Sequence, residues 1–112
     1  MHELSICQSI GAIVRKHAAG RGVRTVHIRI GKLRQIVPDT LVYCWTLVNE
    51  ETPLAGSRLE VESIPAAIRC LQCQHTQTLT EVLLVCDSCG SQQVEIIAGE
   101  EFLITSLELM EA

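Results

Sequence analysis

The sequence predicts an α+β domain with two helices and a small three-stranded mixed sheet, interrupted by a cysteine-rich module. Two stretches have apolar residues at helical spacing, three alternate apolar and polar residues as strands do, and four of the six cysteines lie together before the last strand. With 112 residues, 47% of them hydrophobic but only 3% aromatic, the chain is long enough for one compact domain with an aliphatic core.

The first helix is expected from Leu4 to Ala18, before Gly20 and Gly22. These glycines are expected to end it, because glycine readily adopts the left-handed conformation at a helix end. The predicted buried face has three- and four-residue spacing and consists of Ile6, Ile10, Ile13, Val14 and His17 or Ala18.

A strand, a helix and a second strand are expected next. Residues 24–31, RTVHIRIG, alternate apolar and polar side chains, which predicts a half-buried strand with His27 on its polar face. Pro38 and Asp39 open the second helix. Residues 58–63, RLEVES, alternate again, and this strand–helix–strand order favours one parallel pair. The predicted apolar face of the second helix consists of Leu41, Val42, Trp45 and Val48.

Residues 101–110, EFLITSLELM, predict the last strand. Leu103, Leu107 and Leu109 are expected on one face, with Phe102 and Ile104 on the other. A strand with apolar residues on both faces is either covered on both sides or bulged.

The cysteine spacing C-x2-C-x12-C-x2-C predicts a zinc site made by Cys70, Cys73, Cys86 and Cys89. Each pair lies at the ends of a tight turn, and twelve residues suffice for a hairpin that brings the second turn back. Four thiolates satisfy the tetrahedral sulfur coordination that zinc prefers and leave no position open. Gly90 suits a turn whose backbone amides crowd toward sulfur. We therefore predict a zinc-ribbon-like module of residues 66–99, inserted into an α+β domain of residues 1–65 and 100–112.

Other functions of the module fit the sequence less well. A catalytic zinc keeps an open position and usually has histidine or carboxylate ligands. A thioredoxin-like redox site needs one CxxC at a helix start. A nucleic-acid-binding ribbon needs basic and aromatic residues, whereas residues 66–99 contain one base, Arg69, and no aromatic residue. His75 either reaches the metal if a thiolate leaves or is an exposed turn residue.

The amino terminus offers a second group of metal ligands. The α-amine of Met1, the amide nitrogen and imidazole of His2, and the amide nitrogen of Glu3 can form the planar nitrogen site that nickel(II) and copper(II) favour. A histidine at position 2 also occurs by chance, so this pattern alone leaves both interpretations open. Cys7 and Cys44 lie on or beside apolar helix faces, where free cysteine behaves as a small buried hydrophobe.

Charge is distributed unevenly along the chain, although the net charge is −4. Seven bases and no acid lie between Glu3 and Asp39, and seven acids but no Lys or Arg follow Arg69. This pattern is typical either of ordinary solvated faces or of a basic docking surface for an acidic partner.

The sequence contains no apolar run of the roughly 18 residues needed to span a bilayer, and no secretory signal at its start. A cytoplasmic location is therefore expected. Because that compartment keeps thiols reduced, metal binding or packing explains the six cysteines better than disulfides do.

Taken together, these features resemble the HypA/HybF family. The resemblance extends along the whole chain and is most specific at MHE (1–3), IGKL (30–33), AGSRLEVESIPA (55–66) and CDSCG (86–90). It implies a nickel metallochaperone for [NiFe]-hydrogenase maturation, and in some organisms for urease. A zinc-ribbon protein-interaction or nucleic-acid-binding module is the alternative.

The resemblance also implies roles for individual residues. His2 matches the nickel-binding histidine of the family, with main-chain nitrogens of Met1 and Glu3 contributing, and the four cysteines match its structural zinc ligands. A HypB-type GTPase and the hydrogenase large subunit are the implied partners, with no nucleic acid or membrane and no catalytic activity. Whether the chain forms a homodimer is left open. Gly90 stands where some members have a histidine, so any histidine-assisted zinc rearrangement would depend on His75.

Overall fold

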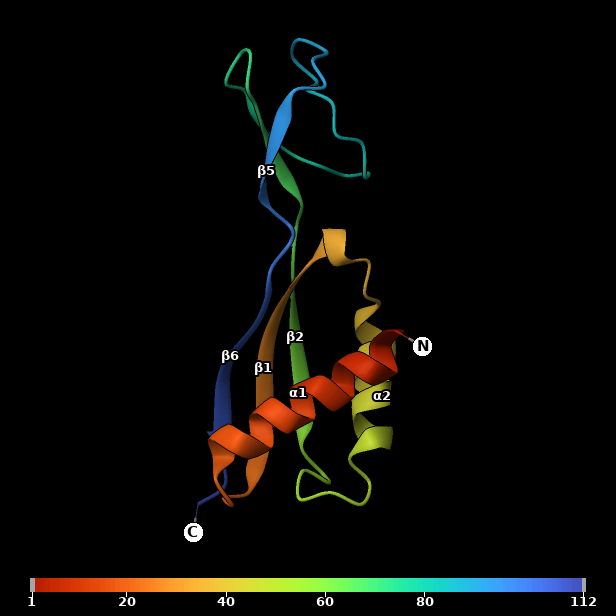
Figure 1. Cartoon of the computed structure of the whole chain (residues 1–112), viewed down its shortest axis with the longest axis vertical. Helices are drawn as coiled ribbons and strands as arrows, with labels where there is room; N and C mark the ends of the chain where they lie inside the picture. Colours follow the sequence, from red (N-terminus) through yellow and green to blue (C-terminus); the bar gives the residue numbers. More distant parts are fainter. Residues whose placement is uncertain (1, 112) are drawn as a thin grey trace. The chain divides into compact units, whose positions relative to one another are not determined.

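The computed structural model describes residues 2–111, with only the backbone of His2 (Figure 1). Its two main helices are α1 (His2–Ala18) and α2 (Pro38–Val48), and a short 3-10 helix, η1 (Lys32–Arg34), follows the first strand. The strands are β1 (Val23–Gly31), β2 (Arg58–Ile64), β3 (Ala67–Cys70), β4 (Thr76–Thr78), β5 (Val94–Ala98) and β6 (Phe102–Leu109). The two predicted helices and the three long predicted strands are confirmed.

The three long strands form one mixed sheet in the order β2-β1-β6. β1 and β6 are antiparallel, since the N–H of Gly31 donates to the carbonyl of Glu101 and the N–H of Met110 donates to that of Gly22, both at 2.8 Å. β2 runs alongside β1 in the same direction (Figure 1). The predicted parallel pair is therefore confirmed.

The chain divides into two compact units. One consists of Met1–Arg29, Ile36–Glu62 and Leu103–Ala112, and the other of Ile30–Gln35 and Ser63–Phe102. The first unit contains both main helices, and the second contains the four clustered cysteines.

Helix α1 buries most of the predicted stripe, with Cys7 in addition and without Ile13. Cys7, Ile10, Val14 and Ala18 are buried, and His17 is exposed, so Ala18 is the inward residue of the predicted alternative His17 or Ala18; Ile13 is 47% exposed, and its predicted burial was wrong. The spacing of 3, 4 and 4 residues keeps the buried set on one face that packs against α2. The helix ends at Ala18, and Ala19 and Gly20 both have positive φ, +51° and +87°.

Helix α2 begins with Pro38 at its first turn, where the missing N–H costs nothing. It buries Leu41, Cys44 and Trp45, and the indole N–H of Trp45 donates to Ser57 Oγ at 3.0 Å. The predicted inward position of Val42 was wrong, because this side chain is 39% exposed.

The last strand changes its buried face halfway along. Ile104 is partly buried before Thr105 and Ser106, which are both exposed, and Leu107 and Leu109 are partly buried after them. The two consecutive exposed residues reverse the alternation. Leu103 is 52% exposed, so it is not buried with Leu107 and Leu109, as its spacing had predicted.

The cysteine-rich segment contains a second sheet, which was not predicted from the sequence. Its strand order is β4-β3-β5, and both neighbours of β3 are antiparallel to it. Ile68 at its centre is fully buried. These strands have only three to five residues, too few for a clear period of two.

Gly31, at the end of β1, lies against the backbone of Gly99. A Cβ added at Gly31 would come within 1.9 Å of the Gly99 carbonyl oxygen, and its φ of −72° is one that any residue adopts. We therefore expect Gly31→Ala to lower the free energy of unfolding by about 3 kcal/mol, through steric overlap alone. Chemical denaturation followed by circular dichroism measures this change.

Gly20→Ala is the matched control, because an added Cβ there meets no atom within 4 Å and only the φ of +87° is unfavourable. Its expected cost is about 1 kcal/mol. Equal costs for the two substitutions would contradict the steric explanation.

Candidate metal centre

The first cysteine turn leaves β3 and returns into β4. The N–H of Cys70 donates to the carbonyl of His75 at 2.8 Å, and the N–H of Gln74 donates to the carbonyl of Cys70 at 3.1 Å. The N–H groups of Gln72 and Cys73 both point at Cys70 Sγ, each at 3.4 Å. The backbone therefore presents hydrogen-bond donors to a thiolate at this position.

The second turn repeats this backbone pattern. The N–H of Cys86 donates to the carbonyl of Ser91, and the N–H of Gly90 donates to that of Cys86, both at 2.9 Å. Gly90 has a φ of +76°, and a Cβ there would meet no atom within 4 Å. The turn therefore requires glycine at this position for its left-handed conformation and not for the close approach expected from the sequence. Gln74 takes the same conformation in the first turn, with φ of +68°.

The two turns bring the four predicted cysteines to one point. Their sulfurs lie within 4.8 Å of one another, and Cys70–Cys89 and Cys73–Cys86 are each separated by 3.6 Å. These separations exceed the roughly 2.05 Å of a disulfide. They fit the edge of about 3.8 Å of a tetrahedron with metal–sulfur bonds of about 2.3 Å. The donor set and its spacing fit a zinc ribbon.

The acidities of the thiols indicate why a cation suits the cluster. The N–H of Cys73 and that of Gln72 outweigh burial and lower the pKa of Cys70 to about 6. At Cys89 the N–H of Ser91 favours the thiolate, but the Cys70 sulfur, burial and the other two sulfurs together raise the pKa to about 12. Without a cation the cluster therefore does not ionise fully near neutral pH, whereas a divalent ion would stabilise all four thiolates.

His75 lies beside the cluster and forms an ion pair with Asp87. Its Nε2 is 2.9 Å from Asp87 Oδ1, and the imidazole is 42% exposed. It is thus a turn residue facing a carboxylate that belongs to the second cysteine turn.

Of the predicted nickel ligands, Glu3 lies in the first turn of α1. Met1 and the side chain of His2 lie outside the described residues, and the helix begins at His2. Glu3 Oε2 accepts a hydrogen bond from the N–H of Val37 at 3.4 Å, which joins the first turn of α1 to the residue that caps α2.

Cys7 and Cys44 do not belong to the metal cluster. Both are buried, as predicted, and the Cys7 thiol donates to the carbonyl of Leu41 at 3.3 Å. Burial, together with the nearby Cys44 and Glu3, raises the pKa of Cys7 to about 12. A protonated thiol with an acceptor inside the protein is a packing residue and not a metal ligand.

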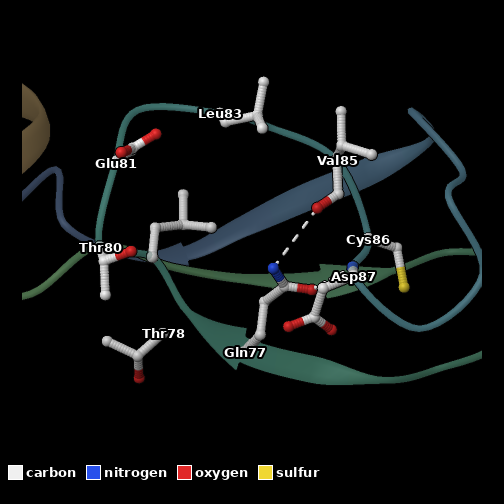
Figure 2. Close-up of a pocket in the computed structure, with 9 residues that line it drawn as sticks. Gln77, Thr78, Thr80, Glu81, Leu83, Val85, Cys86 and Asp87 are labelled. Carbon is white, nitrogen blue, oxygen red and sulfur yellow. Dashed lines mark hydrogen bonds between the residues drawn. The ribbon is translucent and has the colours of Figure 1, made fainter.

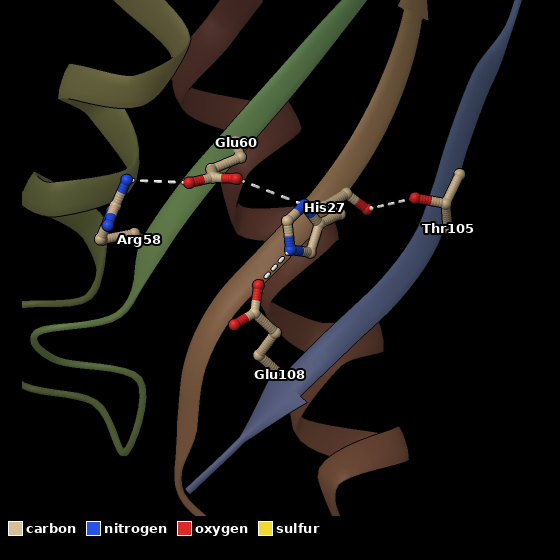
Figure 3. Close-up of polar contacts among 5 residues, drawn as sticks. All are labelled: His27, Arg58, Glu60, Thr105 and Glu108. Atoms are coloured by element: carbon tan, nitrogen blue, oxygen red, sulfur yellow. Dashed lines mark hydrogen bonds and ion pairs between the residues drawn. The ribbon is translucent and has the colours of Figure 1, made fainter.

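A second polar cluster, on the sheet of the first unit, was not predicted as a cluster. His27 on β1 has Nδ1 3.4 Å from Glu60 on β2 and Nε2 2.5 Å from Glu108 on β6 (Figure 3). Arg58 approaches the other oxygen of Glu60 at 2.8 Å. Because both ring nitrogens face carboxylates, His27 links three strands, as expected for a polar face. The two carboxylates face different nitrogens of the ring and do not converge on one point. The His27 contacts therefore connect neighbouring strands and do not form a metal site.

No helix among residues 2–111 is long and apolar enough to cross a membrane.

Residues 1–109 match the family described as hydrogenase/urease nickel incorporation, metallochaperone, HypA. A hydrogenase maturation factor HypA from Nostoc punctiforme is 41% identical and aligns over 99% of this chain and 97% of its own length. One from Desulfosudis oleivorans is 36% identical over 99% and 100%.

Two solved structures have the same fold. The solution structure of a HypA protein aligns with a TM-score of 0.69 and 25% identity, covering 98% of this chain and 97% of that one. The solution structure of the nickel metallochaperone HypA from Helicobacter pylori aligns with a TM-score of 0.67 and 23% identity, covering 98% of both chains.

Proposed function

The chain belongs to the HypA family, and from this premise we propose that it binds nickel(II) at its amino terminus and delivers the ion for maturation of [NiFe]-hydrogenase or of urease. The observation that supports this most directly is the family match over residues 1–109, which includes both the amino-terminal residues and the four cysteines. The relatives are maturation factors by name, and we propose that this chain likewise has no catalytic activity of its own.

The nickel ligands in this proposal are the imidazole and main-chain nitrogen of His2, the α-amine of Met1 and the main-chain nitrogen of Glu3. Helix α1 begins at His2, and the first amide nitrogens of a helix lie outside its i→i−4 ladder. Metal binding at the His2 nitrogen therefore breaks no helical hydrogen bond. Deprotonated amides would also offset the positive end of the helix dipole, which otherwise disfavours a cation there.

The second metal in the proposal is a structural zinc held by Cys70, Cys73, Cys86 and Cys89. Sulfur separations of 3.6 Å and four thiolate donors suit zinc and leave no position for exchange. The two metals then have different roles. Zinc keeps residues 66–99 folded, whereas nickel at the α+β domain of residues 1–65 and 100–112 can leave by ligand exchange.

We infer partners of the kind that the family function requires, a HypB-type GTPase and the hydrogenase large subunit, acting in the cytoplasm. The basic segment from Arg15 to Arg34 is a candidate docking surface for an acidic partner. Nucleic acid is disfavoured, because Arg69, the one base of residues 66–99, forms an ion pair with Glu95.

An amino-terminal extension tests the nickel proposal without changing any native side chain. A few residues added before Met1 convert the α-amine to an amide, so we expect affinity for nickel to fall by at least about 10-fold. Isothermal titration of extended and unextended protein with nickel measures this. Equal affinities would contradict a chelate that includes the amino terminus, and equal zinc contents would establish that both forms are folded.

A further inference from the structure

The second cysteine turn needs contacts from outside itself to remain at the metal centre. The first turn connects β3 directly to β4, but residues 79–93, which contain the second turn, include no strand. After the turn, one backbone bond holds this segment, since the N–H of Leu71 donates to the carbonyl of Gln93 at 2.9 Å. Before the turn, the N–H of Leu79 donates to the carbonyl of Ala66 at 2.7 Å, which holds only the start of the segment, so residues 80–87 need other contacts.

Apolar packing contributes little there. The loop before the second turn arches away from β4 over a hollow of ≈ 380 Å³ lined by residues 77–81, 83 and 85–87. Its side chains Val82, Leu83 and Leu84 are all exposed, the first two by 63% and 60%. Polar contacts must therefore hold the segment that enters the turn.

The side-chain amide of Gln77 makes these contacts. From β4, its Oε1 accepts the N–H of Asp87 at 2.9 Å, and its Nε2 donates to the carbonyl of Val85 at 3.4 Å. Figure 2 shows this side chain reaching from β4 to Val85 and Asp87, with Cys86 between them. The amide thus bonds the peptide groups on both sides of one cysteine.

The Gln77 amide makes the two hydrogen bonds that a neighbouring strand would otherwise make. In an antiparallel sheet, some residues lie between two widely spaced hydrogen bonds. For such a residue, the carbonyl of the preceding residue and the N–H of the following residue both face the neighbouring strand. For Cys86 these groups are the Val85 carbonyl and the Asp87 N–H, and the Gln77 amide supplies one donor and one acceptor to them. Cys86 is 1% exposed, so fixing its backbone also fixes the direction of its sulfur.

We propose that Gln77 is a positioning residue of the metal centre, holding Cys86 in place for metal binding through the two adjoining peptide groups. The inference rests on the proposed structural zinc. The ion pair between His75 and Asp87 is a second link between the turns, so loss of Gln77 alone should loosen the centre and not abolish it. Partners outside the ligand set commonly change metal affinity by about 10–100-fold.

The test compares zinc release from the full, zinc-loaded chain in an excess of a chromophoric chelator. Gln77→Met keeps the length of the side chain but removes both hydrogen bonds, and we expect it to accelerate release about 10-fold. Gln77→Glu keeps an oxygen that accepts the Asp87 N–H, and its release rate should stay within about threefold of wild type. Gln92→Met makes the same substitution at an exposed glutamine of the module and should change the rate less than about twofold.

Each result decides one question. Wild-type release from Gln77→Met, or equal acceleration in Gln92→Met, would overturn the positioning role. Acceleration in Gln77→Glu as large as in Gln77→Met would also overturn it, because the shorter hydrogen bond is retained there. If wild-type protein held no zinc at all, the zinc assignment itself would fail, which is a separate result.

Discussion

His2→Ala is expected to weaken nickel binding by at least about 100-fold, because it removes the imidazole that closes the proposed chelate. The α-amine and main-chain nitrogens alone form a less complete set of donors. Titration of tag-free protein with nickel, by calorimetry or by competition with a chromophoric chelator, measures the loss. Zinc content should remain at wild-type level, since the four cysteines are untouched.

His17→Ala is the matched control for this experiment. His17 lies in the last turn of α1, is exposed, and is at the opposite end of the same helix from His2. We expect its loss to change nickel affinity less than about twofold. Nickel binding that survived His2→Ala, or that fell equally in His17→Ala, would remove the nickel assignment from the amino terminus.

The sequence predicted the elements of the fold better than their buried faces. In α1 the neighbours Ile13 and Val14 are both apolar, and three- and four-residue spacing accommodates either one. Tertiary packing, including the contact between α1 and α2, decides that Val14 and Cys7 face inward. Similarly, Leu103 has the right spacing for the face of Leu107, but the alternation reverses between Thr105 and Ser106, which no local pattern reveals.

The metal cluster was predictable because its ligands are few, chemically distinctive and regularly spaced. The contacts that support it were not. Gln77 forms hydrogen bonds with backbone groups, which every residue type has, so no sequence motif marks its partners. The short strand that contains it, Thr76–Thr78, is too polar to be distinguished from a loop. His27 and Glu108 are 81 residues apart, and they meet only because β6 pairs with β1.

Cys73→Ser is expected to abolish stable zinc binding, with metal content falling from about one zinc per chain to near zero after dialysis against a chelator. Serine does not supply a thiolate, and three remaining cysteines leave the ion open to water. A structural zinc contributes about 10–16 kcal/mol of apparent free energy, far more than this small sheet gains from burying Ile68. We therefore expect amide exchange in residues 66–99 to become fast.

Cys44→Ala is the control that separates metal loss from the loss of any buried cysteine. Cys44 is buried in α2, outside the cluster, so its replacement should lower stability modestly while leaving the zinc content at about one. The helices should retain slow exchange in Cys73→Ser, because α1 and α2 form their contacts with each other in the unit without the four cysteines. A Cys73→Ser protein that retained zinc and slow exchange in residues 66–99 would show that the four-thiolate site does not hold the module together. Fast exchange throughout the chain would instead mean that residues 66–99 stabilise the α+β domain of residues 1–65 and 100–112 as well.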